Sequence, residues 1–144
     1  MIIEDYVGFK TASLLKKKGF DEDCRKWYFG AEHIDCDGNK VPKDKLLDSC
    51  TPYVNNKYTD TACTAPTIQQ AIKWVRKKGF HIVPYLDIDY DEDERGTKWY
   101  HQATYYPEVI RICDGECMCD DGRLYATPEQ ACEAGIIFFL ENLI

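Results

Sequence analysis

The sequence predicts a single α+β domain, residues 1–144, in which three helices pack on a mostly antiparallel sheet built from β-hairpins. Three observations support this fold class. Two capping boxes, Thr67–Gln70 and Thr127–Gln130, mark helix starts, because each pairs an N-cap hydroxyl with a side chain three residues later. Between them, the hydrophobic residues change from helical spacing to strand alternation near Ile82. Asp-Gly pairs then recur in the second half of the chain, as in tight hairpin turns.

Length and composition suit one globular domain, since the chain has 144 residues and 44% of them are hydrophobic. The longest apolar run, residues 135–140, is too short to cross a bilayer. The first residues lack the basic region, apolar core and cleavage site of a secretory signal. We therefore expect a cytoplasmic protein that does not associate with membranes.

The net charge of −7 is unevenly distributed. Residues 84–121 hold 11 acidic and 3 basic side chains, a balance of −8, whereas residues 1–83 hold 14 basic and 11 acidic ones, a balance of +3. Because an acidic surface repels phosphate backbones, we expect no direct nucleic-acid binding. An acidic surface would instead suit a basic protein partner.

The first helix is predicted over residues 9–18, because Phe9, Ala12 and Leu15 share one face and a lysine run followed by Gly19 is typical of a helix end. Alternation predicts a strand over residues 24–29. After it, Asp37-Gly38 favours a turn into a return strand.

Residues 42–66 form the least regular part of the sequence, being rich in Asp, Asn, Thr, Lys and Pro. We expect a long ordered loop packed by Tyr53 and Tyr58, in which residues 43–49 could form one or two helical turns. Because catalytic residues often lie on such loops, this segment is the place for a site if the protein is a small enzyme.

The central helix is predicted over residues 67–78, followed by a strand over 82–90, an acidic turn over 91–96 and a return strand over 98–106. Two Asp-Gly turns then predict a meander through Val109–Cys113, Glu116–Asp120 and Arg123–Ala126, with Ile110 opposite Cys119 and Ile112 opposite Cys117. A final helix over 128–143 should lie against the sheet. The expected core includes Trp74, Val75, Phe80, Ile82, Leu86, Ile110, Ile112 and Phe138.

The eight cysteines suggest reduced thiols, since no export signal accompanies them. One set could hold zinc through four thiolates, which would make the protein a zinc-stabilised interaction module: Cys113, Cys117, Cys119 and Cys132. Its spacing lacks the usual C-x2-C turns, and the predicted hairpin register turns Cys113 away from the next two thiols. We therefore favour cysteines packed as small core residues, with neither metal nor other cofactor.

An acidic run along the predicted hairpin resembles the start of a calcium loop but lacks the required glycine and final glutamate. The same residues, with nearby tyrosines that combine contact area and a polar tip, form the candidate partner-binding surface: Asp87, Asp89, Asp91, Asp93, Tyr85 and Tyr100. A solvated, charged hairpin edge is the structural alternative. None of the three histidines, His33, His81 and His101, lies in a catalytic motif, so binding is favoured over catalysis.

Three stretches resemble small uncharacterised proteins of gut Bacteroidales phages and mobile elements. They are the opening FKTASLLKKKGF, then Ala65-Pro66-Thr67 with Ala71, Lys73, Trp74 and Arg76, and finally Tyr125 to Ala131 with Glu133-Ala134-Gly135. The cysteine-rich DGECMCDDG segment and the long DEDERG turn depart from that pattern. The resemblance implies a mobile-element setting, and it supplies no activity and no catalytic residues. A protein-binding role, accessory or host-interacting, is the function that we expect in such a setting.

Overall fold

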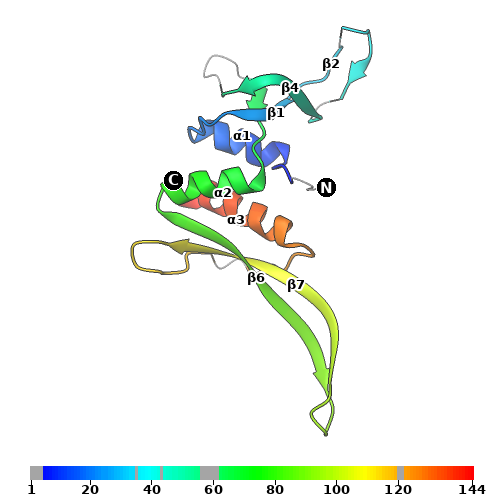
Figure 1. The fold of residues 1–144 in the computed structure, drawn as a ribbon, viewed down its shortest axis with the longest axis vertical. Helices are drawn as coiled ribbons and strands as arrows, with labels where there is room; N and C mark the ends of the chain where they lie inside the picture. The colour runs from blue at the N-terminus through cyan, green and yellow to red at the C-terminus, as the bar shows by residue number, and fades with distance from the viewer. Residues whose placement is uncertain (1–4, 35, 43, 56–61, 120–121) are drawn as a thin grey trace. The chain divides into compact units, whose positions relative to one another are not determined.

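The computed structural model describes residues 5–34, 36–42, 44–55, 62–119 and 122–144. The elements follow in the order α1 (Phe9–Lys17), β1 (Cys24–Phe29), β2 (His33–Ile34), β3 (Lys40–Val41), β4 (Leu46–Tyr53), β5 (Ala62–Thr64), α2 (Ile68–Lys77), β6 (Phe80–Glu92), β7 (Lys98–Arg111) and α3 (Pro128–Asn142) (Figure 1). Three helices with antiparallel strands confirm the α+β class. The chain divides into two compact units, residues 1–71 with Ile144 and residues 72–143, which are described separately; the prediction of a single domain stays a prediction.

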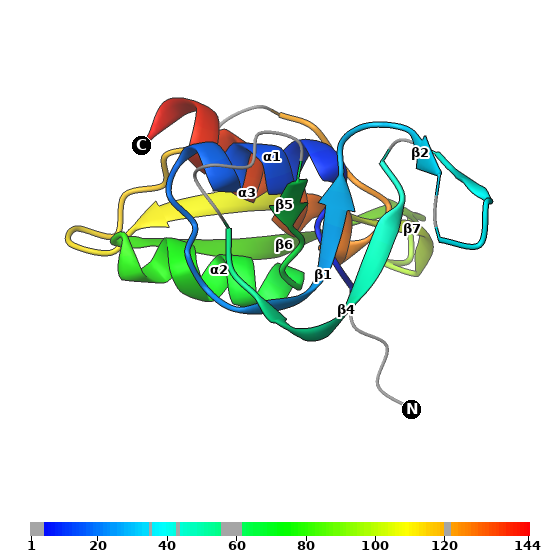
Figure 2. The same cartoon turned by 90° about the horizontal axis from the view of Figure 1, so that it is seen from above.

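In the first unit, β1 is the middle strand of a three-stranded antiparallel sheet with β4 and β5 at its edges (Figure 2). Trp27 of β1 lies opposite Leu47 on one side and Thr64 on the other. The neighbouring Tyr28 is buried, and its hydroxyl donates to the carbonyl of Val7 over 2.8 Å. The strand β1 and the helix α1 were therefore predicted correctly, to within one residue.

The prediction of a loop over residues 42–66 is wrong, because the strands β4 and β5 lie within this range. Their backbone hydrogen bonds are made with β1, a partner distant in the sequence, which a local pattern of polar residues does not reveal. Asn55 fixes the return from β4: its amide donates to the carbonyl of Phe20, and its side-chain oxygen accepts from the Thr64 N–H, each over 2.9 Å. Tyr58 lies outside the described residues, as does the side chain of Tyr53.

The capping box at α2 forms as predicted, whereas at α3 only the N-cap half of the predicted box forms. Thr67 and Gln70 exchange side-chain to backbone hydrogen bonds of 3.0 and 3.1 Å at the start of α2. Thr127 caps α3, since its hydroxyl accepts from the Gln130 N–H over 3.2 Å, ahead of Pro128 at the first helical position. Among the described residues, the helices are each too short or too polar to cross a lipid bilayer.

The second unit is built on β6 and β7, which form a long two-stranded antiparallel ribbon. Helix α3 packs on the first part of this ribbon, where Gly135 lies against Ile82 and Val109. The side chains buried in this unit include Ile72, Trp74, Val75, Ile82, Pro107, Val109, Cys119, Ala131, Cys132, Ile136, Phe139 and Leu140.

The expected core is therefore only partly right. Trp74, Val75 and Ile82 are buried, while Phe80, Ile110 and Phe138 are half-buried. Leu86 and Ile112 were predicted as core residues but are 46% and 52% exposed. Alternation identified the face of the ribbon to which Leu86 belongs, but it could not show that α3 covers only the first part of that face.

The ribbon contains two prolines that face each other, Pro84 of β6 and Pro107 of β7. On the outer edge of β7, Tyr105 exchanges both of its backbone hydrogen bonds with Tyr125, over 2.7 and 2.8 Å. Since hydrogen-bonded and non-hydrogen-bonded pairs alternate, Leu86–Tyr105 and Pro84–Pro107 are both non-hydrogen-bonded pairs. The two prolines therefore cost the ladder no hydrogen bond, because their missing N–H groups would have pointed outward.

The predicted meander after the hairpin is wrong in both its extent and its register. Strand β7 continues through Pro107 to Arg111, and Ile110 pairs with Cys117 and not with Cys119. The Asp114-Gly115 pair lies in a wider loop, because the Arg111 guanidinium binds Asp114 over 2.5 Å and Glu116 over 2.7 Å across it. These ion pairs, together with an Arg111 N–H to Glu116 carbonyl bond of 2.8 Å, fix the longer connection.

Candidate binding surface on the ribbon

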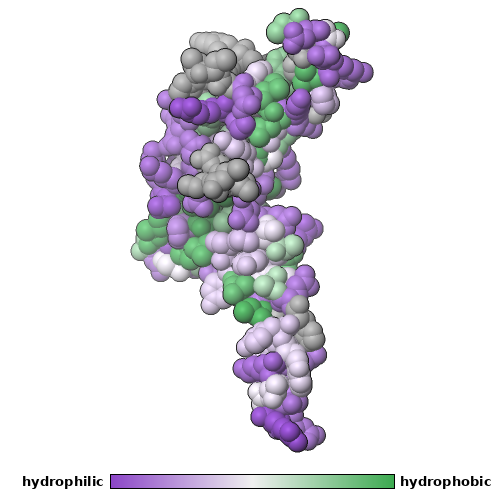
Figure 3. All heavy atoms as spheres, turned by 45° about the vertical axis from the view of Figure 1, so that its right-hand side comes forward, coloured by the Kyte–Doolittle hydropathy of each residue, from purple (hydrophilic) through white to green (hydrophobic). Residues whose placement is uncertain are grey.

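The outer half of the ribbon is exposed although it carries large apolar and aromatic side chains. We define the distal ribbon as residues 85–92 of β6, residues 98–106 of β7 and the turn between them (Figure 1). Its large hydrophobic side chains are exposed, with exposed fractions of 51% for Tyr85, 46% for Leu86, 41% for Ile88, 43% for Tyr90, 52% for Trp99 and 65% for Tyr100. In Figure 3, hydrophobic side chains show partway along the ribbon and strongly hydrophilic ones gather at its tip.

One face of the distal ribbon is apolar and continues the face that α3 covers. Leu86, Ile88 and Tyr90 alternate along β6 in phase with the buried Ile82. Tyr90 and Tyr100 pair across the strands with ring centroids 5.9 Å apart, and the Lys98 ammonium lies 4.8 Å from the centre of the Tyr90 ring. We call this surface the apolar face.

The opposite face carries the carboxylates of Asp87 and Asp91 and is called the acidic face. Tyr85 and Tyr106 pair across the strands there, with ring centroids 5.2 Å apart, and Asp87 and Asp91 follow on β6. Desolvation, followed by the nearby Glu108, Tyr85 and Asp87, raises the pKa of Tyr106 above its ordinary value. The hydroxyl of Tyr106 is therefore neutral at physiological pH and can donate a hydrogen bond.

The six predicted binding residues do not share one face. Tyr85, Asp87 and Asp91 lie on the acidic face, whereas Tyr100 belongs to the apolar face. Asp93 lies in the turn, where its carboxylate accepts from the N–H groups of Arg95 and Thr97, each over 2.9 Å. Its role in the turn is therefore structural. Asp89 belongs to β6, but its side chain lies outside the described part of the structure.

The four cysteines considered for zinc are placed differently from one another: Cys113 and Cys117 are exposed, while Cys119 and Cys132 are buried. Across the described ranges, no group of three or more His, Cys, Asp or Glu side chains is placed to hold a metal ion. Burial raises the pKa of Cys132 to about 11, as it does for Cys24 and Cys63 in the first unit. These three thiols are protonated at neutral pH and behave as small apolar residues.

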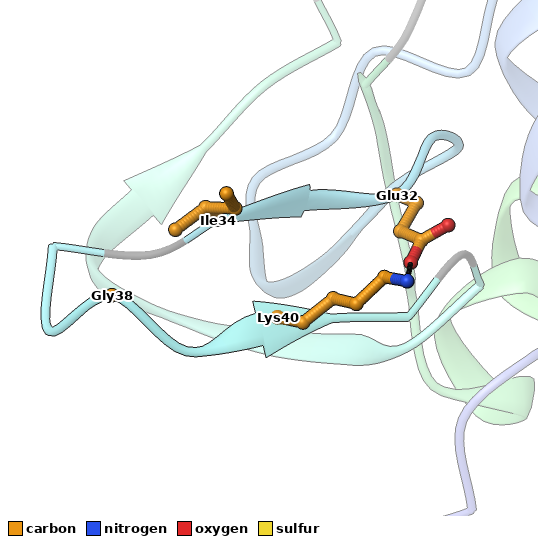
Figure 4. Close-up of a pocket in the computed structure, with 4 residues that line it drawn as sticks. All are labelled: Glu32, Ile34, Gly38 and Lys40. Atoms are coloured by element: carbon orange, nitrogen blue, oxygen red, sulfur yellow. Dashed lines mark ion pairs between the residues drawn. The ribbon is translucent and has the colours of Figure 1, made fainter.

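A hollow of about 490 Å³ lies at the β2–β3 hairpin of the first unit, lined by Glu32, Ile34, Gly38 and Lys40 (Figure 4). The Lys40 ammonium is held by the Glu32 carboxylate over 2.6 Å. Ile34 is 72% exposed and gives the hollow no enclosed apolar wall. Its two charged groups thus satisfy each other, and the hollow lacks the convergent polar groups of a ligand site.

Of the three histidines, only His81 has a described side chain; its Nδ1 is buried without a hydrogen-bond partner among the described residues. It lies on the acidic side of the ribbon, opposite Ile110 and close to the core. Among the described residues, the distal ribbon combines exposed large apolar side chains with carboxylates, and we therefore take it as the candidate binding surface.

No family model matches the chain, and comparison with curated proteins and with solved structures gives no match.

The exposure of Leu86, Ile88 and Trp99 was not predicted from the sequence. Leu86 and Ile88 alternate with carboxylates, but a strand covered on one face has the same pattern. One feature of the sequence could have indicated this exposure: it contains too few apolar segments to cover the whole length of so long a hairpin. Only one strongly apolar helix follows it, and α3 covers the half near Ile82.

Proposed function

We propose that this protein is a non-catalytic binding protein that contacts a basic protein partner through the distal ribbon. The observation that carries the proposal is the exposure of both faces of this ribbon beyond the cover of α3. A two-stranded ribbon is only marginally stable in water by itself, and exposed apolar patches are typical of interaction surfaces. Burying each large side chain of the apolar face in a partner would contribute about 1.5–3 kcal/mol.

The charge of the ribbon favours a basic partner. Residues 85–106 hold six acidic and two basic side chains, a balance of −4. Such a field speeds association with a positively charged surface and disfavours acidic partners. The resemblance to phage and mobile-element proteins supports a host protein as the partner, with the encounter in the host cytoplasm.

Charge reversal tests the proposal. Asp87→Lys with Asp91→Lys should abolish capture of basic proteins from a host lysate, because it removes the attraction without touching the turn that Asp93 holds. The matched control is Asp21→Lys with Asp23→Lys, the same change of charge at exposed residues outside the ribbon. Affinity capture with mass spectrometry at low and high salt measures the result. If both variants capture the same proteins as the wild type, the distal ribbon is not the binding surface.

A further inference from the structure

Within the described residues, no strand pairs with the outer edge of β6, whereas the outer edge of β7 is paired at Tyr105 and again from Val109 to Arg111. Tyr125 pairs with Tyr105 on the β7 side, and Met118 donates to the carbonyl of Val109 over 2.7 Å further along. The sheet contains only β6 and β7, so within the described chain no strand pairs with the outer edge of β6. Unpaired strand edges are templates for an added strand.

The register identifies the backbone groups that this edge presents. Because Tyr105 directs its N–H and carbonyl toward Tyr125, its partner Leu86 directs its own N–H and carbonyl outward from β6. Ile88 lies two residues further along, opposite Ala103, and does the same. The side chains of both residues belong to the apolar face, while Asp87 between them belongs to the acidic face.

We propose that the partner contributes an extended segment that adds as an antiparallel strand to the edge of β6 at Leu86 and Ile88. This inference rests on the proposed function and names its mode of recognition. The segment alternates apolar and basic residues. Its apolar side chains extend the face of Leu86 and Ile88, and its basic side chains meet the row that contains Asp87. Pairing with a second copy is disfavoured, because it would place two acidic rows side by side.

A synthetic peptide of alternating valine and lysine is the probe, and its affinity for the full chain is measured by fluorescence anisotropy. In the proposed register the valines lie opposite Leu86 and Ile88 and exchange backbone hydrogen bonds with them. N-methylation of the valines should therefore weaken binding at least about tenfold, a loss of about 1.4 kcal/mol. The matched control is N-methylation of the lysines, whose N–H groups point away from β6 and should change affinity little. Equal losses with the two methylated peptides would overturn strand addition.

A pair of protein variants tests the same edge. Ile88→Pro removes an outward N–H and no β6–β7 hydrogen bond, so it should weaken binding more than Ile88→Ala, which removes only the side chain. Equal losses would assign the binding to side chains alone and overturn strand addition. Circular dichroism checks that both variants keep the fold.

Two further outcomes separate this inference from the proposed function. If the wild type does not bind the peptide while the Asp87 and Asp91 reversal still loses its lysate partners, strand addition is wrong and the proposed function stands. A concentration-dependent dimer that Ile88→Pro abolishes would show that a second copy of the chain, and not a basic segment of a partner, occupies the edge of β6. That result would overturn the inference.

Discussion

Gly135 of α3 and Ile82 of β6 approach so closely that a Cβ atom built on the glycine would lie 2.8 Å from Ile82 Cγ2. The same atom would lie 3.2 Å from Pro107 Cβ. The glycine therefore allows the helix to pack directly on the ribbon, where Ile82 and Val109 are buried. This contact anchors the covered half of the ribbon, from which the exposed half extends.

Gly135→Ala should destabilise the protein by about 1–3 kcal/mol, although alanine favours a helix by about 1 kcal/mol over glycine, because the added methyl group overpacks the contact with Ile82. Chemical denaturation measures the change in the free energy of unfolding. In an Ile82→Ala background, where Cγ2 is absent, the same substitution should cost less. An equal cost in the two backgrounds would show that Ile82 is not the obstacle.

Thr127→Ala should cost about 1 kcal/mol of stability, because the Gln130 N–H then loses its acceptor at the start of α3. Thermal or denaturant unfolding measures the loss. The conservative Thr127→Ser keeps a hydroxyl acceptor and should retain nearly all of the stability. A serine variant as unstable as the alanine variant would assign the effect to the lost methyl group instead of the cap.

Cysteine alkylation should divide the thiols by their burial. Burial raises the pKa values of Cys24, Cys63 and Cys132 from 9.0 to about 11, so their thiolate fraction at pH 8 falls about 100-fold. Brief treatment with iodoacetamide should label the exposed Cys36, Cys113 and Cys117 first, as read by peptide mass spectrometry. The buried thiols should become reactive on unfolding. Labelling of Cys63 at the rate of Cys36 in the folded protein would contradict the packing of β5.

The carboxyl group of Asp114 should have a pKa below its ordinary value. The larger cause is the hydrogen bonding from Arg111, and the smaller is the hydrogen bond from the Glu116 N–H. A lowered pKa in the folded state contributes stability that is present above the unfolded value, near 4, and is lost as the pH falls through the folded value. Carboxyl NMR shifts measure the midpoint. Arg111→Gln should raise it, whereas Arg95→Gln in the distant turn should not. An unchanged midpoint in Arg111→Gln would exclude this ion pair as the cause.

Local signals predicted the elements whose determinants are local. Thr67 with Gln70, and Thr127 with Pro128, specify helix starts through side chains within three residues, and the structure contains both. Strand β6 was found because its alternation is long and regular. These features depend on hydrogen bonds and periodicity that neighbouring residues determine by themselves.

Features that depend on distant partners were not predicted. Leu46 and Leu47 become strand residues because β1 lies beside them, opposite Tyr28 and Trp27. The turn at Asp114 is longer than its Asp-Gly pair suggests, because Arg111 binds across it. The candidate surface was found in part, since its carboxylates were recognised but the division into two faces needed the cross-strand register.

Pro84 of β6 also limits the length of a strand that could be added to this edge. Pro84 offers no N–H to the outer edge of β6, so a continuous ladder of added hydrogen bonds ends there. A strand that joins this edge can extend from the turn only as far as Tyr85, and it stops before it reaches the part of the ribbon that α3 covers. Pro84 thus marks the boundary between the part of the β6 edge that can continue such a ladder and the part of the ribbon that packs against α3.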